Sequence, residues 1–263
     1  MVSKELQRPQ PPHLSDRFPN EYDKLILAEV DSTNTHAARL VTKLNRPTWI
    51  LGLKQTAARG RRGRKWVNLE GNFAATLVLF TQETAETLAL RSFVASLALF
   101  EALVIVTGRS DLFSLKWPND VLLNGLKMAG ILLETIFLDT DQKAILIGVG
   151  VNLIAAPDMA QIEENAMPVV SLFSATEARI APEQFLDYLA SCYAIRETEL
   201  VQNGFQPIRT AWLEHAARLG EGIAARLPNR EIFGQFDTID EKGHLVLKTQ
   251  RGKEFIAAAD VFF

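Results

Sequence analysis

The sequence predicts an α/β domain followed by a small all-β domain, and three observations support this prediction. Apolar β-rich runs alternate with long helical patterns up to about Leu219, as expected when helices cover a sheet. Beyond Gly220, short β-rich segments alternate with turns at Pro228-Asn229, Lys242-Gly243 and Arg251-Gly252, which favours a small β structure such as a barrel. A length of 263 residues with 48% hydrophobic residues allows one sizeable core plus this appendage.

The chain begins with a polar, proline-rich stretch, residues 1–24, which we expect to be a flexible lead-in. It has no apolar segment of the kind a signal peptide carries. Asp31, Ser32 and Thr33 then offer N-cap chemistry to a helical pattern that places apolar residues on one face. Strands are expected over 48–54 and 72–80.

The most apolar part of the chain predicts a long helix over 85–106, ended by Gly108. We interpret it as a buried helix, because its apolar run is short for a bilayer and contains Glu101. The single cysteine, Cys192, lies in another apolar helical pattern and is expected to be core filler.

Residues 114–134 predict two strands around Asn124-Gly125, because both residues tolerate a positive φ and Asn-Gly between apolar runs favours a hairpin. Lys127 follows this turn directly. The remaining expected elements are a strand over 144–151, a loop over 157–168, and helices over 182–203 and 208–219.

Residues 54–66, KQTAARGRRGRKW, form the most unusual segment, which we call the cationic loop. It concentrates positive charge in a chain whose formal net charge is -3, and its ends are held by two predicted strands. One hypothesis is a solvated or nucleic-acid-binding patch. The other is a clamp that binds phosphates and a carboxylate through arginines and glycine-freed N–H groups.

The charge of the loop suits a reaction between two anions. A carboxylate brought to 4 Å from a phosphate is opposed by about 4 kcal/mol at an effective dielectric near 20. Nearby cations reverse that sign, and a carboxylate already ionised at neutral pH needs positioning rather than a general base. The mildly acidic composition, with a pI near 5.9, weakens the nucleic-acid hypothesis.

Four segments, DSTN (31–34), the cationic loop, LKWPNDVLLNGLKMAGILLE and GVGVNL, follow one another with spacing that resembles the biotin protein ligases. The resemblance extends from about Leu25 to the C-terminus. It implies a mixed-sheet catalytic domain over 25–219 and an SH3-like barrel over 220–263. It also implies that biotin and ATP, with Mg²⁺, form biotinyl-5′-AMP, and that the biotinyl group passes to a lysine of a biotin carrier protein of acetyl-CoA carboxylase or a related carboxylase.

The same resemblance assigns roles to individual residues. It implies that biotin is bound by Ser32, Thr33, Asn34, Gln55, Arg59, Gly60, Arg61, Lys127 and Gly130. It implies that ATP is bound by Arg64, Trp66, Asn119, Lys127 and Asn152. Lys127, Arg61 and Asp120 would be catalytic, with Asp120 also the candidate Mg²⁺ ligand.

Some features depart from the family pattern. Ala58 stands where many members have glycine, and Ala259-Asp260-Val261 replaces a common Gly-Asp-Val. About 25 residues precede the catalytic pattern, too few for the DNA-binding module of the repressor members, so we expect no repressor function. We also expect a cytoplasmic protein that can form a homodimer and has no nucleic-acid or membrane partners. A lipoate ligase is the alternative enzyme.

Overall fold

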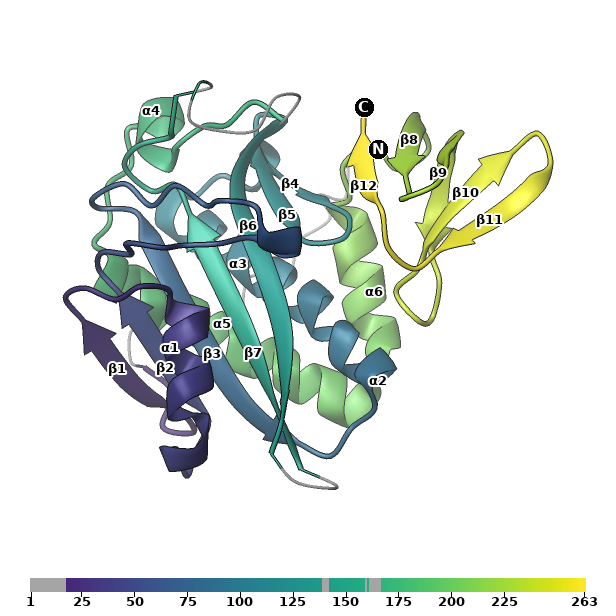
Figure 1. Ribbon diagram of the computed structural model, residues 1–263. Helices are drawn as coiled ribbons and strands as arrows, with labels where there is room; N and C mark the ends of the chain where they lie inside the picture. Colours follow the sequence, from purple (N-terminus) through teal and green to yellow (C-terminus); the bar gives the residue numbers. More distant parts are fainter. Residues whose placement is uncertain (1–17, 139–141, 159, 161–166) are drawn as a thin grey trace, which may run out of the picture.

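The computed structural model describes residues 18–138, 142–158, 160 and 167–263. Its larger sheet is mixed and seven-stranded, in the order β1-β2-β3-β7-β6-β5-β4 (Figure 1). Only β1 and β2 run parallel. The strands are β1 (Asp23–Leu27), β2 (Thr48–Gly52), β3 (Phe73–Thr81), β4 (Phe113–Lys116), β5 (Asp120–Leu123), β6 (Leu126–Phe137) and β7 (Lys143–Val151).

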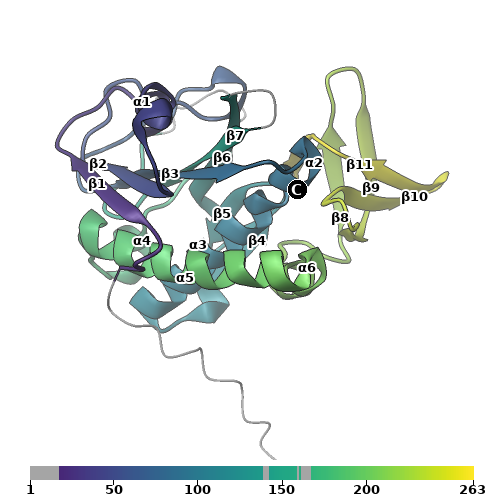
Figure 2. The ribbon, with the colours of Figure 1, turned by 90° about the horizontal axis from the view of Figure 1, so that it is seen from below.

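Helices cover the two faces of this sheet unequally. Figure 2 shows α3 and α5 on one face and α1 on the other. The buried core lies mainly between the sheet and α3, α5 and α6, so the face that carries α1 is left for a binding site. The helices are α1 (Thr33–Leu40), α2 (Ala85–Ala89), α3 (Arg91–Thr107), α4 (Leu172–Thr176), α5 (Pro182–Asn203) and α6 (Phe205–Glu214).

Local chemistry explains the helix ends that the sequence predicted. The Ser32 side chain accepts from the Thr35 N–H, so Ser32 is the N-cap of α1. Gly108 ends α3 in the left-handed region with φ 68° and donates its N–H to the Val104 carbonyl. Cys192 is buried in α5 as expected, and burial raises the pKa of its thiol to about 12.

The long helix predicted over 85–106 is wrong in one respect, because it is divided at Leu90 into α2 and α3. The Leu90 N–H donates to the Thr87 carbonyl and the Phe93 N–H to the Leu90 carbonyl, i→i+3 contacts that tighten the chain there. Ala85–Thr107 is long and apolar enough to cross a membrane, more than the sequence suggested. However, 72% of its most apolar window is buried within the protein, as in a core helix.

The prediction of two strands over 114–134 is also wrong, because the segment forms parts of three. Asn124 and Gly125 make the predicted turn, with φ 51° and 78°, between β5 and β6. A second turn at Trp117–Asn119 separates β4 from β5. Pro118 lacks an N–H and therefore cannot continue the ladder of the strand that the apolar pattern suggested.

Three further elements differ from expectation. Strand β1 and helix α4 were not predicted, and the helix expected over 208–219 runs from Phe205 to Glu214. It ends early because His215 and Ala217 pair with Leu115 of β4: the Leu115 N–H donates to the His215 carbonyl, and the Ala217 N–H donates to the Leu115 carbonyl. The predicted lead-in, residues 1–24, and the loop over 157–168 lie partly outside the described residues.

The C-terminal residues form a second, five-stranded antiparallel sheet in the order β11-β10-β9-β8-β12. Its SH3-like character stays a prediction. The Trp117 indole N–H donates to the Gly243 carbonyl at 3.0 Å, which ties this sheet to the turn between β4 and β5. The strands are β8 (Gly222–Arg226), β9 (Glu231–Ile239), β10 (Leu245–Thr249), β11 (Gly252–Ile256) and β12 (Asp260–Phe262).

Candidate active site

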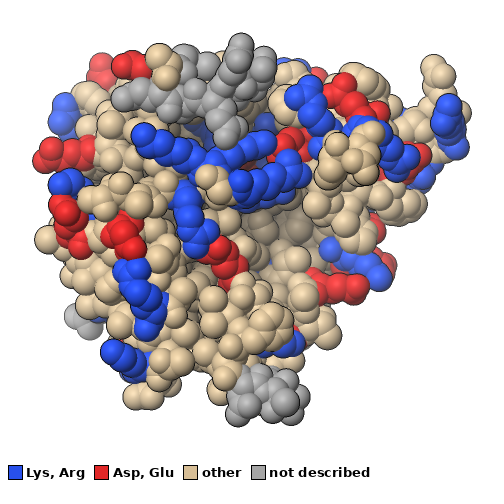
Figure 3. Space-filling view, in the orientation of Figure 1, with Lys and Arg blue, Asp and Glu red and all other residues tan. Residues whose placement is uncertain are grey.

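A cavity of about 1020 Å³ lies between the cationic loop, strands β6 and β7, and strand β12. The loop crosses the open face of the larger sheet (Figure 1), and its lysines and arginines gather there beside a hollow (Figure 3). The cavity brings together every residue to which the sequence assigned a role. These are Ser32, Thr33, Asn34, Gln55, Arg59, Gly60, Arg61, Arg64, Trp66, Asn119, Asp120, Lys127, Gly130 and Asn152.

The cationic loop is folded back on itself as a short ribbon. Arg59 and Lys65 form an antiparallel bridge, and the Gly60 N–H donates to the Arg64 carbonyl at 2.7 Å. The chain reverses at Arg62 and Gly63, which have φ 57° and 74°. Glycine relieves the backbone strain of this reversal. Ala58 does not adopt a positive φ, so alanine is accommodated at this position without backbone strain.

The floor of the cavity is formed by paired glycines of β6 and β7. Gly130 and Gly150 are register partners, and the Trp66 indole lies on both. A Cβ on Gly150 would lie only 2.8 Å from Trp66 Cε2, and one on Gly130 would lie 3.6 Å from Trp66 Cζ3. The absence of a side chain at these two positions therefore lets an aromatic ring lie against the sheet backbone.

One end of the cavity is polar and built by the first turn of α1. The Gln55 side-chain oxygen accepts from the Thr33 N–H at 2.8 Å and lies 3.3 Å from Thr33 Oγ1. This contact orients the Gln55 amide, which leaves its NH₂ group as a donor. Thr76 of β3 lies 2.9 Å from the same Thr33 hydroxyl. Short hydroxyls and an amide can thus present both donors and acceptors to a ligand.

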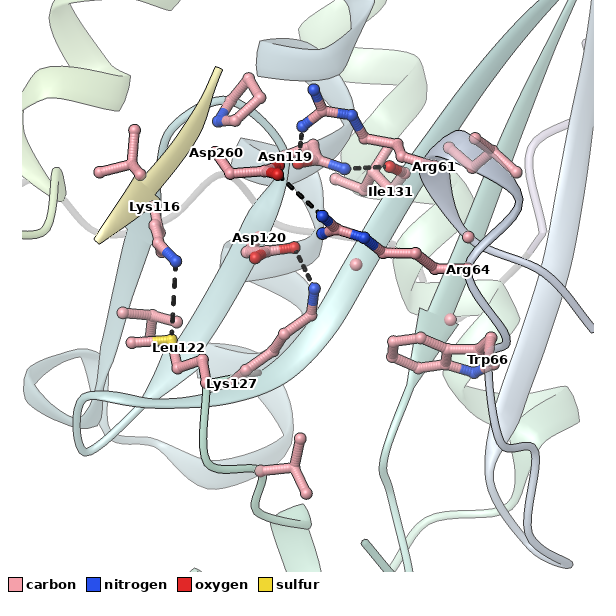
Figure 4. A pocket seen from close by; sticks show the side chains of 18 of the residues that line it. Arg61, Arg64, Trp66, Lys116, Asn119, Asp120, Leu122, Lys127, Ile131 and Asp260 are labelled. Atoms are coloured by element: carbon pink, nitrogen blue, oxygen red, sulfur yellow. Dashed lines mark hydrogen bonds and ion pairs between the residues drawn. The ribbon is translucent and has the colours of Figure 1, made fainter. Parts of the chain in front are cut away.

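The centre of the cavity holds an ion pair between strands β5 and β6. Lys127 Nζ lies 2.7 Å from Asp120 Oδ1 (Figure 4). A Cβ on Gly130 would lie 3.5 Å from Asp120 Oδ1 and 3.6 Å from Lys127 Nζ, so glycine leaves room for both groups. Arg61 reaches the same region from the loop and donates to Asn119 Oδ1 at 2.9 Å. Burial lowers the pKa of Arg61 below its usual value, although the guanidinium stays charged at neutral pH.

Asn152, at the end of β7, has a more structural environment than the other predicted residues. Its side-chain NH₂ donates to the Val170 carbonyl at 3.3 Å and its backbone N–H to the Met128 carbonyl. It therefore holds the segment after residue 167 against the cavity. Its contact with a nucleotide stays a prediction.

Comparison with known proteins identifies the family. Residues 27–152 match the biotin/lipoate A/B protein ligase family, and residues 219–263 match the biotin protein ligase C-terminal domain. The sequence is 48% identical to a biotin–[acetyl-CoA-carboxylase] ligase of Paracoccus denitrificans, covering 90% of this chain and 99% of that one. The chain belongs to the biotin protein ligases.

More distant relatives agree with this assignment. The ligase is 30% identical to the bifunctional ligase/repressor BirA of Bacillus subtilis, over 90% of this chain and 73% of that one. A solved structure of the Aquifex aeolicus biotin protein ligase, in complex with biotin and ATP, matches with a TM-score of 0.77. It is 26% identical, and the match covers 91% of this chain and 98% of that one.

Several charged groups that line the ligase cavity were not predicted from the sequence, and Asp260 and Lys116 are two of them. Asp260 of β12 accepts from Arg62 at 2.6 Å and from Arg64 at 2.8 Å. Its partial burial opposes ionisation, but the Arg64 hydrogen bond and the charges of the arginines hold the pKa of this carboxyl below its usual value. Lys116 of β4 points into the cavity near Asp120 (Figure 4), and burial lowers its pKa.

The position of Asp260 also shows that the site is shared between the two sheets, because residues 259–263 line the cavity. A charge-complementarity argument could have flagged Asp260, since Ala259-Asp260-Val261 stood out as a departure. No local pattern indicates that this carboxylate faces loop arginines about two hundred residues earlier, because only the docking of the C-terminal sheet brings them together.

Proposed function

We propose that this ligase activates biotin with ATP to biotinyl-5′-AMP and transfers the biotinyl group to a lysine of a biotin carrier protein. The observation that carries the proposal is the single cavity in which a hydrogen-bonding end, a band of cations and an aromatic surface meet. The identity to the Paracoccus ligase supports acetyl-CoA carboxylase as the source of the carrier.

In the first step, a biotin carboxylate oxygen attacks the α-phosphorus and pyrophosphate leaves. The ureido ring of biotin would lie at the polar end, where Thr33 and the oriented Gln55 amide can pair with its carbonyl and N–H groups. Lys127 and Arg61, which line the same cavity, would then lie where the carboxylate and phosphate meet. Two cations offset the repulsion between these anions and stabilise the charge that develops on phosphorus.

In the second step, the lysine amine of the carrier attacks the biotinyl carbonyl carbon, and AMP leaves with the bonding electron pair. The amine must lose a proton to become an amide nitrogen. Asp120, beside Lys127 in the cavity, is the carboxylate we assign as its acceptor. The neighbouring Lys127 charge stabilises the negative charge that develops on the departing AMP phosphate.

The residues present fit Mg²⁺ only in part. Asp120 offers a carboxylate oxygen, but the Asn119 side-chain oxygen already accepts from Arg61. Among the described residues, no group of three acidic, histidine or cysteine side chains could hold a metal. Mg²⁺ commonly binds through one carboxylate plus substrate phosphates, so Asp120 would hold it together with ATP. When bound, it neutralises phosphate charge.

The decisive experiment incubates the protein with ATP, Mg²⁺ and an acetyl-CoA carboxylase carrier domain, with either biotin or lipoate, and weighs the carrier by mass spectrometry. We expect the mass of one biotinyl group and no lipoyl transfer. Lipoyl transfer alone would assign the chain to the lipoate branch of the family. Omitting Mg²⁺ should abolish labelling by either acid.

The cytoplasmic location, a homodimer and the absence of nucleic-acid partners stay predictions. A mobility-shift assay tests the last of them, because binding through the cationic loop would weaken steeply as salt rises. Sedimentation with and without biotinyl-5′-AMP tests the homodimer.

A further inference from the structure

Glu134 of β6 connects two parts of the cavity wall that are distant in sequence. Its Oε1 accepts from Arg59 Nη1 at 2.6 Å, and its Oε2 accepts from Arg59 Nη2 at 2.7 Å. The same Oε2 accepts from Asn34 Nδ2 at 2.9 Å. Arg59 belongs to the cationic loop and Asn34 to the first turn of α1, and both line the cavity. Within the described part of the chain, Glu134 is not one of the lining residues.

Asn34 is itself fixed from the opposite side. Its Oδ1 accepts from the Thr76 hydroxyl at 2.6 Å, and Asn34 and Thr76 are 3% and 0% exposed. A Cβ on Gly148 would lie 2.2 Å from Asn34 Oδ1, so only glycine leaves space for this amide. The amide therefore has one orientation, with its NH₂ group directed at Glu134. Thr76 of β3 therefore fixes Asn34, and Asn34 in turn fixes the Glu134 carboxylate that pairs with Arg59 of the loop.

The contact between Glu134 and Arg59 is a strong ion pair. It is bidentate and charge-assisted, which gives both strength and a defined direction. Partial burial opposes ionisation of the carboxyl, yet the bonds from Arg59 and Asn34 prevail and lower the pKa of Glu134. The pair is therefore charged at neutral pH, and opening the loop at Arg59 would separate two partly desolvated charges.

We propose that Glu134 is a positioning residue that keeps the cationic loop closed over bound biotin and so slows the release of biotin and its adenylate. Through Arg59 it holds the cationic loop, and through Asn34 it holds the first turn of α1 beside the expected position of the ureido ring, so the loop and this turn move as one unit. This inference rests on the proposed function, because biotin is the ligand that the loop encloses.

The test measures the biotin dissociation rate by stopped-flow tryptophan fluorescence in the full-length protein without ATP. Glu134→Gln keeps the size of the side chain and removes its charge. We expect dissociation to accelerate about tenfold, equivalent to about 1.4 kcal/mol, with KM for biotin rising by a similar factor and kcat changing much less. Glu134→Asp, which keeps the charge, should recover part of the slow release.

Two further comparisons separate positioning from general stability. Arg59→Gln should accelerate release as Glu134→Gln does, and the double variant should be no faster than the faster single one, since one contact is removed in all three. Asp111→Asn breaks a bidentate Arg109–Asp111 pair whose side chains are 58% and 63% exposed and which lies outside the cavity. As the matched control it should release biotin at the wild-type rate.

The outcomes distinguish this inference from the proposed function. A wild-type protein that is folded but does not bind biotin would overturn the proposed function. If the wild type binds biotin and Glu134→Gln releases it at the same rate, the positioning role is wrong, even if the melting temperature falls. Should Glu134→Gln fail to fold, additive effects of Arg59→Gln and Glu134→Asp would equally contradict a shared contact.

Discussion

Arginines of the cationic loop pair with carboxylates at two places. The two places differ in the strand that carries the carboxylate. At the inner attachment, Arg59 contacts Glu134 on β6, in the part of this strand that pairs with β7 of the large sheet. At the outer attachment, Arg62 and Arg64 contact Asp260 on β12, an edge strand of the small sheet. The two attachments thus join one loop to two different sheets.

This difference indicates how the loop works. The inner attachment is supported by the pairing of β6 with β7 and by the Asn34–Thr76 contact, so it should resist opening. The outer attachment uses arginine side chains that are 45% and 46% exposed, and one of them, Arg64, is predicted to bind nucleotide phosphate. A triphosphate that bound Arg64 would compete directly with Asp260 for its guanidinium. We therefore expect the loop to open at the outer attachment when ATP enters.

The largest effect on activity is expected from substitution of Lys127, which belongs to neither attachment. Lys127→Ala should slow pyrophosphate release about 10²- to 10³-fold, the usual loss when a group that stabilises transition-state charge is removed. Biotin binding should change far less, because the inner attachment remains. Single-turnover release of pyrophosphate measures this, with circular dichroism as the folding control. A rate close to wild type would exclude Lys127 from the chemistry.

A smaller effect is expected from the glycine floor. Gly150→Ala places a methyl group in the space of the Trp66 indole, and overpacking of this kind costs about 1–3 kcal/mol. The indole must move, so we expect KM for ATP to rise about tenfold while biotin dissociation stays near wild type. Gly222→Ala, where nothing lies within 4 Å of the added Cβ, is the matched control. Equal behaviour of the two variants would contradict a role for the Trp66 position.

The outer attachment should respond differently from the inner one. Asp260→Asn removes the charge that competes with ATP for Arg64, so we expect KM for ATP to fall about twofold, as for other exposed ion pairs. Biotin dissociation should not change. Steady-state kinetics over a range of ATP measures this, and Asp237→Asn, which breaks two lysine pairs elsewhere in the small sheet, is the control. A rise in KM would mean that Asp260 orients Arg64 rather than competing for it.

The smallest effect is expected on the melting temperature at low pH, where protonation of Glu134 and Asp260 removes both attachments. The pKa values of Glu134 and Asp260 are lowered in the folded protein, so both groups stabilise it above their unfolded pKa values, about 4. That stabilisation is lost as the pH falls through the lower folded values. The melting temperature should therefore fall below about pH 4, and less steeply in Glu134→Gln, which has already lost its share. Parallel curves would contradict a lowered pKa at Glu134.

Features that depend on neighbouring residues could be predicted from the sequence. The Ser32 cap, the Gly108 helix end and the Asn124-Gly125 turn are properties of a few adjacent residues, and the structure confirms all three. The division of the long helix at Leu90 and the extra turn at Pro118 were missed. The hydrophobic pattern continues across Leu90, so periodicity alone could not show that break. At the second break, Pro118-Asn119-Asp120 is a turn signal in the sequence, and the prediction of two strands did not use it.

The residues of the candidate site also fall into those that could be predicted from the sequence and those that could not. Residues within recognisable motifs, such as Gln55, Arg61 and Lys127, were found because their order along the chain carries the resemblance, and the structure gathers them in one cavity. Glu134 and Asp260 were not assigned a role. Each acts on the cationic loop from a distant strand, and no local pattern records which carboxylate an arginine will meet.

By itself, the sequence determined the family, the two-part α/β and β organisation, and the set of groups available for the chemistry, because these follow from residue types and short-range spacing. Only the tertiary structure decided how the cationic loop is held, since that depends on sheet order and on the docking of the C-terminal strands. The sequence shows that arginines and carboxylates attract one another, but it does not show which arginine pairs with which carboxylate. The pairing is decided only when folding brings one carboxylate, and not another, within hydrogen-bonding distance.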